Sequence, residues 1–236
     1  MAPDGEVRLA APPRAGDATA EEPLGESRWP PIAAVLVFMV INIALRIWMP
    51  REATFHLPWV VPSIEAGLII GLIVSDPTGP AERRRLRHMS LILVGLLVVA
   101  ALWATVVLVD DLIRGVGVSE SPSELLAAGA VVWLGNNLSF ALLYWLMDSG
   151  GPRARTQLSV PVDFAFTQHM SPELAPPGWR PVFLDYLHLG FTNATAFSPT
   201  DVMPLSLRAK YTMLVQSTVA LALFGLVVAR AVNAFT

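Results

Sequence analysis

The sequence predicts an all-α, polytopic membrane protein with about five transmembrane helices and one re-entrant hairpin. The first reason is composition: of 236 residues, 54% are hydrophobic and only 15% are charged, and the mean hydropathy is +0.55. Soluble globular domains rarely reach such values. The second reason is a series of apolar stretches about as long as a helix needs to cross a membrane. The third is a polar loop within residues 191–206, between two apolar segments.

The first 28 residues differ from the rest of the chain. They are rich in alanine, proline, glycine and acidic residues and contain almost no large apolar side chains. Such a segment buries too little surface to offset the entropy lost on ordering, so we expect residues 1–28 to form a disordered tail. A secretory signal begins with basic residues and a short apolar run, whereas this acidic tail precedes a long one. The first span is therefore expected to stay in the mature protein.

Five apolar stretches account for the expected membrane helices. A helix needs roughly 20 apolar residues to cross the hydrocarbon. The stretches that meet or approach this length are 29–49, 57–75, 89–113, 124–147 and 207–235. The first three form an N-terminal membrane region, 29–123. The last two, with the polar loop between them, form a second region, 124–236.

Arginine placement gives the expected orientation. Lysine and arginine stay preferentially on the cytoplasmic side of a membrane, and Arg83, Arg84, Arg85 and Arg87 cluster in one segment. We expect this segment to face the cytoplasm and to contact anionic lipids of the bilayer. The N-terminus is then cytoplasmic as well, in a multi-pass protein of the cell (inner) membrane. The net charge of −3 is small and spread along the chain, so no nucleic acid is expected as a partner.

Residues 182–204 are expected to form the re-entrant hairpin. Pro181 is well placed to start a helix, and the moderately apolar run that follows is short for a span. Ser198, Pro199 and Thr200 then end any helix. Irregular backbone at membrane depth is tolerated only when it is packed in protein or faces a water-filled cavity. Two alternatives are an amphipathic helix on the membrane surface and a sixth full span.

Residues toward the C-terminus follow an order that is known from another protein family. A tyrosine and a phenylalanine precede a pair of threonines, an aspartate, a Pro-Leu-Ser and a final Ala-Arg. The residues in this order are Tyr186, Phe191, Thr192, Thr195, Asp201, Pro204, Leu205, Ser206, Ala229 and Arg230. The stretch resembles the pore helix, filter and inner helix of two-span potassium-channel pore modules. This resemblance implies a channel-like pore module over 124–236, assembled as a homo-oligomer, a tetramer if it follows that family.

The filter departs from the potassium-channel pattern. Those channels use glycines so that rings of backbone carbonyls coordinate the ion, whereas residues 196–200 contain no glycine. The resemblance therefore implies either a cation pore with a degenerate, non-potassium filter or a module that does not conduct. The filter-like residues are Thr192, Asn193, Thr195, Phe197, Ser198, Thr200 and Asp201. The whole chain is also similar to a group of bacterial integral membrane proteins that carry the stretch FTNATAFSPTD and have no established activity.

Polar residues inside apolar stretches are costly and indicate function by default. Glu65 is either a proton or cation site or a neutral acid that packs helices together. Asn136 and Asn137 either line a polar path or form hydrogen bonds between helices. Gln216 and Thr218 lie where an inner helix faces the loop, which favours a place in the lining.

Two further carboxylates have competing interpretations. Asp201 follows the helix-breaking residues of the loop, where it either attracts cations to a pore mouth or caps the turn. Asp185 and His188 share one helix face. A pair without a third ligand is more simply explained by an ordinary hydrogen bond than by a metal site. We expect no metal and no cofactor.

Common enzyme motifs are absent from the sequence. It contains no GxSxG, no HExxH and no glycine-rich phosphate or dinucleotide loop, so we do not expect an enzyme. A channel-like, cation-conducting protein is the first hypothesis, and a non-conducting membrane scaffold or accessory subunit is the second. An intramembrane hydrolase built from Ser198, His188 and either Asp185 or Asp201 is the third.

Overall fold

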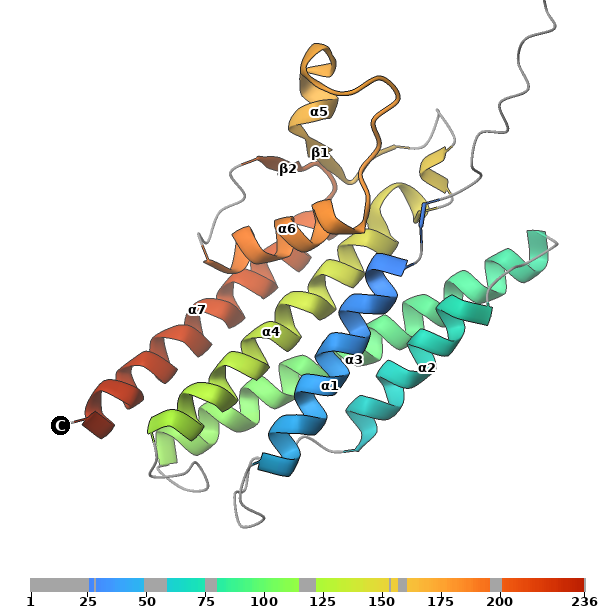
Figure 1. Cartoon of the computed structure of the whole chain (residues 1–236). Coiled ribbons are helices and arrows are strands. Elements are labelled where there is room, and N and C mark those ends of the chain that lie inside the picture. Colours follow the sequence, from blue (N-terminus) through green and yellow to red (C-terminus); the bar gives the residue numbers. More distant parts are fainter. Residues whose placement is uncertain are drawn as a thin grey trace, which may run out of the picture.

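The computed structural model describes residues 26–27, 29–48, 59–74, 80–114, 122–152, 154–156, 161–195 and 201–235. Within these ranges the protein is mostly helical, with seven α-helices (Figure 1). Five of them are long, and they coincide with the five predicted apolar stretches. They are α1 (Trp29–Trp48), α2 (Val60–Val74), α3 (Pro80–Arg114), α4 (Pro122–Met147) and α7 (Leu207–Phe235).

Three of these helices are long and apolar enough to cross a membrane. They contain the spans Arg84–Arg114 in α3, Ser123–Gly150 in α4 and Leu207–Arg230 in α7. The apolar parts of α1 and α2 are shorter, Trp29–Ala44 and Val61–Ile73. The prediction of a helical protein is thereby confirmed, and three helices are long and apolar enough to span a membrane.

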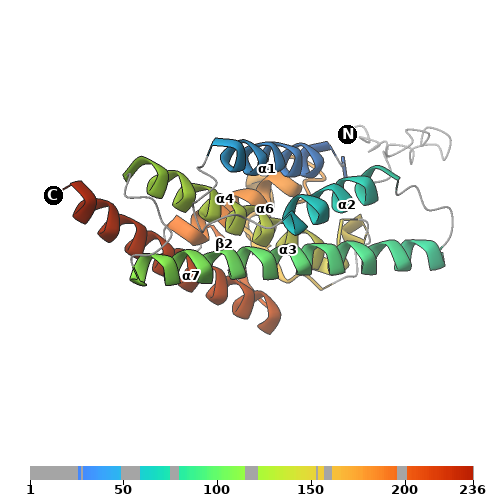
Figure 2. The ribbon, with the colours of Figure 1, turned by 90° about the horizontal axis from the view of Figure 1, so that it is seen from below.

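The centre of the bundle is α4. In α4, 72% of the apolar segment is buried, compared with 33% in α3 and 28% in α7. It packs against α3, α7, α6 and α1, and the view in Figure 2 shows α4 and α6 between α1 and α7. Small residues permit this close packing. At Gly135 a Cβ atom would lie 2.6 Å from the Phe38 ring of α1, so only glycine leaves room for the ring.

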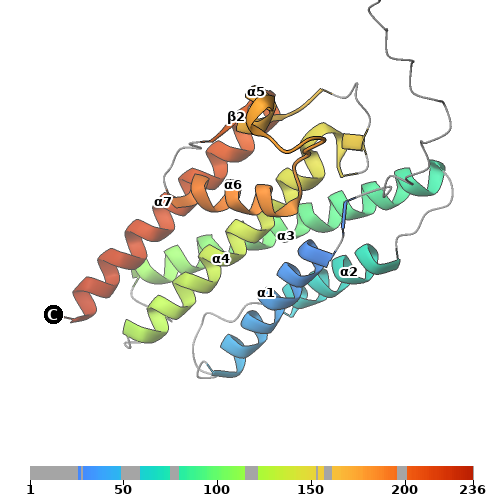
Figure 3. The same ribbon diagram turned by 45° about the horizontal axis from the view of Figure 1, so that its top comes forward.

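A small cap covers the end of the bundle at which α4 ends and α7 begins, called the polar end below. It contains η1 (Asp148–Gly150), η2 (Ala154–Thr156), β1 (Phe164–Phe166), α5 (Thr167–Met170), η3 (Pro172–Leu174) and β2 (Val202–Pro204). The strands β1 and β2 pair antiparallel, with Phe164 opposite Pro204 and Phe166 opposite Val202. Figure 3 shows α5 and β2 above α6 at this end. The two strands are too short to produce a recognisable alternation in the sequence, so the all-α prediction did not include them.

The remaining helix, α6 (Phe183–Thr195), is short and packs against both α4 and α7. It crosses the two long helices obliquely (Figures 1 and 3). After residues 196–200 the chain enters β2, which pairs with β1 and leads into α7. The chain therefore leaves the polar end in α6 and returns to the same end before α7.

Candidate functional site

One buried glutamine joins α6 to both long neighbours. Gln216 of α7 is 1% exposed. Its Oε1 accepts hydrogen bonds from the Tyr144 hydroxyl of α4 at 2.7 Å and from the Asn193 amide of α6 at 2.8 Å. Its Nε2 donates to the Gly190 carbonyl at 2.9 Å, and Asn193 also donates to the Met213 carbonyl at 3.0 Å. Since unpaired buried polar groups are costly, this network fixes α6 in one position between α4 and α7.

Gly190 permits the contact between α6 and α4. A Cβ atom at this position would lie 3.3 Å from the Asn137 carbonyl oxygen and 3.5 Å from the Ala141 methyl group. A side chain at this position would therefore make a tight contact with the α4 backbone. Glycine in a helix interior costs about 1 kcal/mol relative to alanine, and here close packing of the two helices offsets that cost.

A single carboxylate from the N-terminal segment holds the start of α6. Glu26 accepts hydrogen bonds from the Trp145 indole at 2.8 Å, from Arg155 at 3.0 Å and from the backbone N–H of Phe183. The first N–H groups of a helix have no partner within the helix, and a negative charge there also interacts favourably with the helix dipole. Glu26, which was expected to belong to the tail over 1–28, therefore takes part in the fold.

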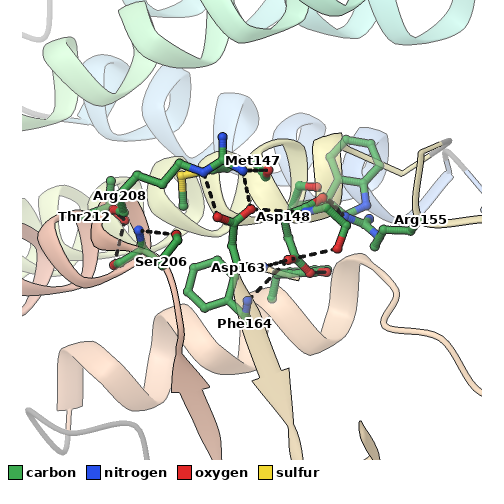
Figure 4. A network of polar contacts seen from close by, with 12 residues as sticks. Met147, Asp148, Arg155, Asp163, Phe164, Ser206, Arg208 and Thr212 are labelled. Atoms are coloured by element: carbon green, nitrogen blue, oxygen red, sulfur yellow. Dashed lines mark hydrogen bonds and ion pairs between the residues drawn. The ribbon is translucent and has the colours of Figure 1, made fainter. Parts of the chain in front are cut away.

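Beside this contact lies a cluster of two aspartates and two arginines at the polar end (Figure 4). Asp148 is fully buried and accepts hydrogen bonds from the backbone N–H of Asp163 at 2.7 Å and from the Tyr186 hydroxyl. Asp163 binds Arg208 through both carboxylate oxygens, at 2.7 Å from Nε and through a second bond from the terminal nitrogen. Arg155 lies over the Tyr186 ring, 4.9 Å from its centre. The cluster ties α4, β1, α6 and α7 together.

The electrostatics of Asp163 follow from this arrangement. Burial by itself raises the pKa of the Asp163 carboxyl, but hydrogen bonds from Arg208 and Ser206, together with the charge of Arg208, outweigh it. The pKa of Asp163 is therefore held below its usual value, and the group is ionised at neutral pH. Sequence reasoning missed this cluster. The only signals were an aspartate directly after the fourth apolar stretch and an arginine at the start of the fifth.

The filter-like residues that the structure describes fall into three groups. Thr192 and Thr195 hydrogen-bond to carbonyls of their own helix, at 3.0 Å and 2.9 Å. Asn193 points into the bundle, as described above. Asp201 is exposed at the polar end, directly before β2. The other predicted filter-like residues, Phe197, Ser198 and Thr200, lie outside the described residues.

The predicted lining residues occupy different environments. Asn136 is buried and donates to the Thr105 hydroxyl of α3 at 2.7 Å, while Asn137 is buried and donates to the Trp133 carbonyl of its own helix at 2.9 Å. Thr218 is exposed and donates to the Leu214 carbonyl one turn earlier. Asn136 and Gln216 thus form hydrogen bonds between helices of one chain. For Asn136 this is one of the two interpretations that the sequence left open.

The two other polar residues singled out in the sequence, Asp185 and His188, also have different environments. Asp185 accepts a hydrogen bond from the backbone N–H of Val182 at 2.7 Å and so caps the start of α6. His188 is exposed on the next turn. Within the described part of the chain, no group of three or more histidine, aspartate or glutamate residues is placed to hold a metal ion.

An apolar groove lies where α6 ends. It has a volume of about 450 Å³ and is bordered by α4, α6 and α7. Gly129, Ala130 and Trp133 line it from α4, Ala194 and Thr195 from α6, and Leu223 and Phe224 from α7. The last carbonyls of a helix carry a partial negative charge, so the end of α6 combines an apolar wall with a weak attraction for cations. No family model, curated protein or solved structure matches this chain.

Proposed function

We propose that α4, α6 and α7 form the pore unit of an ion-channel-like membrane protein that conducts cations through a filter unlike that of potassium channels. The observation that carries this proposal is the short α6, which packs between two long apolar helices and whose chain returns to the polar end before α7. A short helix followed by a returning loop is the arrangement expected of a re-entrant hairpin. Irregular backbone is tolerated at membrane depth where it faces water or protein.

In this proposal α1 and α2 also cross the membrane, so that five spans and one hairpin make up the chain. The polar end then faces the cytoplasm. Arginine placement supports this orientation, because Arg84, Arg85 and Arg87 lie at the start of α3. The Arg87 guanidinium approaches Gly150 of the cap, at 3.7 Å from the position of a Cβ atom there. Anionic lipids of the cytoplasmic leaflet are the partners that such arginines favour.

A single pore unit cannot enclose a pathway, so the proposal requires a homo-oligomer, with four copies if the assembly follows the channel family. Residues 192–201, which begin with the last turn of α6, surround the axis in this assembly. The C-terminal end of α6 supplies a partial negative charge, as half-helices do for cations in transporters. Asp201 supplies a full negative charge at the mouth, which favours cations over anions.

Ion flux into liposomes tests the proposal. Purified protein is reconstituted, and flux is followed under separate potassium, sodium and proton gradients. We expect cation flux above that of empty liposomes, reduced or changed in selectivity by Asp201→Ala. Glu173→Ala is the matched control, because Glu173 is another exposed carboxylate of the cap. Equal effects of the two substitutions would remove Asp201 from the pathway, and absence of flux from folded, oligomeric protein would exclude conduction.

A non-conducting scaffold or accessory subunit is the second proposal, and one observation favours it. The polar side chains where α4, α6 and α7 meet, Tyr144, Asn193 and Gln216, bond to one another inside a single chain rather than facing outward. A scaffold requires only such packing. The third hypothesis, a hydrolase, gains no comparable support, because the Asp185 carboxylate is bonded to the Val182 N–H. The flux experiment separates the first proposal from the second.

A further inference from the structure

The interface between α1 and α2 contains a carboxyl group. Glu65 lies on α2 and is 0% exposed. One of its oxygens, Oε1, accepts a hydrogen bond from Nδ2 of Asn42 on α1 at 3.1 Å. Asn42 itself is 4% exposed. This pair lies outside the α4, α6 and α7 unit, and the proposed pore makes no use of it.

Each member of the pair has one polar atom without a partner. These atoms are Oε2 of Glu65 and Oδ1 of Asn42, both buried and both unbonded within the described residues. If Glu65 is ionised, both atoms are acceptors only, and neither can satisfy the other. If Glu65 is protonated, Oε2 gains an O–H that can donate to Oδ1. One proton therefore gives both atoms a partner, because it supplies the second hydrogen bond of a carboxylic acid–amide pair.

A small cavity lies beside the pair. Its volume is about 20 Å³, and it is lined by Asn42 and Ser139 together with apolar residues that include Phe38, Val61 and Gly135. A cavity needs roughly 10 to 15 Å³ to hold one water molecule. The cavity therefore has room for one water beside Asn42, but Glu65 does not line it. The same cavity offers too few oxygen atoms to hold a metal cation of the alkali or alkaline-earth type.

The surroundings offer little to neutralise a carboxylate. Glu65 is the only titratable residue between Val60 and Val74, and none of the residues that α3 and α4 contribute to the cavity wall is titratable. On α1 the one charged residue is Arg46, a turn beyond Asn42, and its side chain lies outside the described part of the structure. No ion pair in the described part of the chain involves Glu65. An unpaired charge inside a helical bundle is costly, whereas a proton removes it.

We propose that Glu65 and Asn42 form a buried proton-binding site between α1 and α2. The site takes one proton from water onto Oε2 of Glu65, and the resulting O–H donates to Oδ1 of Asn42. The site holds the proton at acid pH and returns it to water as the pH rises. The loss of the proton leaves a charge and two unpaired acceptors at the interface, so α1 and α2 separate more easily.

Infrared spectroscopy of the reconstituted full-length protein tests the proposal. At neutral pH the wild type is expected to show a carbonyl stretching band of a protonated carboxyl that shifts in heavy water and is absent from Glu65→Gln. The matched control, Glu173→Gln at an exposed glutamate, should keep the band. Asn42→Leu should keep the band at a shifted position, because the acid loses its amide acceptor. Identical wild-type and Glu65→Gln spectra would overturn the proposal. An ionised Glu65 paired with Arg46 would give that result.

Thermal unfolding provides a second, independent readout. A glutamine offers one donor and one acceptor in the same places as the protonated acid. Glu65→Gln should therefore match the wild type at acid pH, where both the folded and the unfolded wild type carry the proton, and it should lose less stability than the wild type as the pH rises. A large loss of stability in Glu65→Gln at neutral pH would show that the ionised carboxylate is required, and would overturn the proposal. Both tests are independent of ion conduction, so they separate this proposal from the proposed function.

Discussion

The side-chain amide of Gln216 on α7 donates to the backbone carbonyl of Gly190 on α6 at 2.9 Å. At Gly190 α6 also lies close to the backbone of α4, because a Cβ atom there would be 3.3 Å from the Asn137 carbonyl oxygen. One residue of the last long helix therefore fixes the backbone of the short helix at its crossing point. If α6 acts as a pore helix, its position depends on hydrogen bonds within each chain and not only on contacts between chains.

Replacing Gln216 is expected to destabilise the whole α4, α6 and α7 unit. In Gln216→Leu the Tyr144 hydroxyl, the Asn193 amide and the Gly190 carbonyl each lose a partner. Each unsatisfied buried group costs about 1 to 3 kcal/mol, and partial relaxation reduces the sum, so we expect a loss of about 3 kcal/mol in the free energy of unfolding. Denaturant titration of the protein in detergent measures this change.

The matched control is Thr218→Val on the same helix. Thr218 is exposed and bonds only within α7, so its replacement should change the free energy of unfolding by less than about 0.5 kcal/mol. Comparable losses in both variants would mean that α7 is sensitive to substitution in general and would contradict a specific role for Gln216.

Two glycines should respond to alanine in opposite ways. Gly190→Ala places a methyl group 3.3 Å from the Asn137 carbonyl oxygen, where backbone must move, and should cost about 1 to 3 kcal/mol. Gly95→Ala on α3 meets nothing within 4 Å and should be neutral or stabilising by up to about 1 kcal/mol. Thermal unfolding of the two single variants checks both signs. A stabilised Gly190→Ala would show that α6 does not pack closely on α4.

The parts of the fold that could be predicted from the sequence are those encoded by continuous apolar stretches. Hydropathy located the five long helices but not the true start of α3, which begins at Pro80 rather than at the expected residue 89. The helix continues through the arginines because arginine, glutamate and alanine are good helix formers. The strands β1 and β2 pair across the segment that contains α5, η3 and α6, and no local pattern marks them.

The candidate site was predictable only in part, for a related reason. Gln216 was identified as a polar residue in an apolar stretch and Asn193 as one of the filter-like residues that the resemblance implies, yet their mutual contact spans 23 residues. The partners of the polar end are joined over larger separations: 45 residues between Asp163 and Arg208, and 157 between Glu26 and Phe183. Ordinary charged residues outside the apolar stretches carry no local signal of such contacts. Their pairing becomes visible only in the three-dimensional structure.

Loss of Arg208 should destabilise the polar end. The Asp163 side chain is 4% exposed, and Arg208 bonds to both of its oxygens. Removing one partner of a buried pair leaves an uncompensated charge, and partial exposure of Arg208 reduces the effect, so Arg208→Ala should cost about 2 kcal/mol. Arg114→Ala breaks a pair whose members are 70% and 51% exposed and should cost less than about 1 kcal/mol. Denaturant titration distinguishes the two, and equal costs would contradict the importance of burial.

Loss of Glu26 should loosen the start of α6 more than the rest of the molecule. Glu26→Ala removes the partner of the Trp145 indole, of Arg155 and of the Phe183 N–H. Hydrogen exchange measured by mass spectrometry should then accelerate in the first turn of α6, while the middle of α4 keeps its protection. Glu173→Ala, at an exposed glutamate, should leave both segments unchanged. Unaltered exchange in Glu26→Ala would mean that Asp185 alone is sufficient to cap α6.

Acid should weaken the polar end through Asp163. The pKa of this carboxyl is lower in the folded protein than its usual value of 3.8, so folding favours the ionised form. Above the usual value the group is ionised in both states, and its full contribution to stability is present. As the pH falls below that value, the unfolded chain takes up a proton before the folded protein does, and the free energy of unfolding decreases.

The decrease ends only below the folded pKa, where both states are protonated. Thermal unfolding between about pH 6 and about pH 3 should therefore show a loss of stability that is smaller in Asp163→Asn, because the amide does not titrate. Asp110→Asn, at an exposed ion pair of α3, should keep the slope of the wild type. A wild-type slope in Asp163→Asn would assign the acid sensitivity to other carboxyls and would show that the Arg208 contact adds nothing to folding at neutral pH.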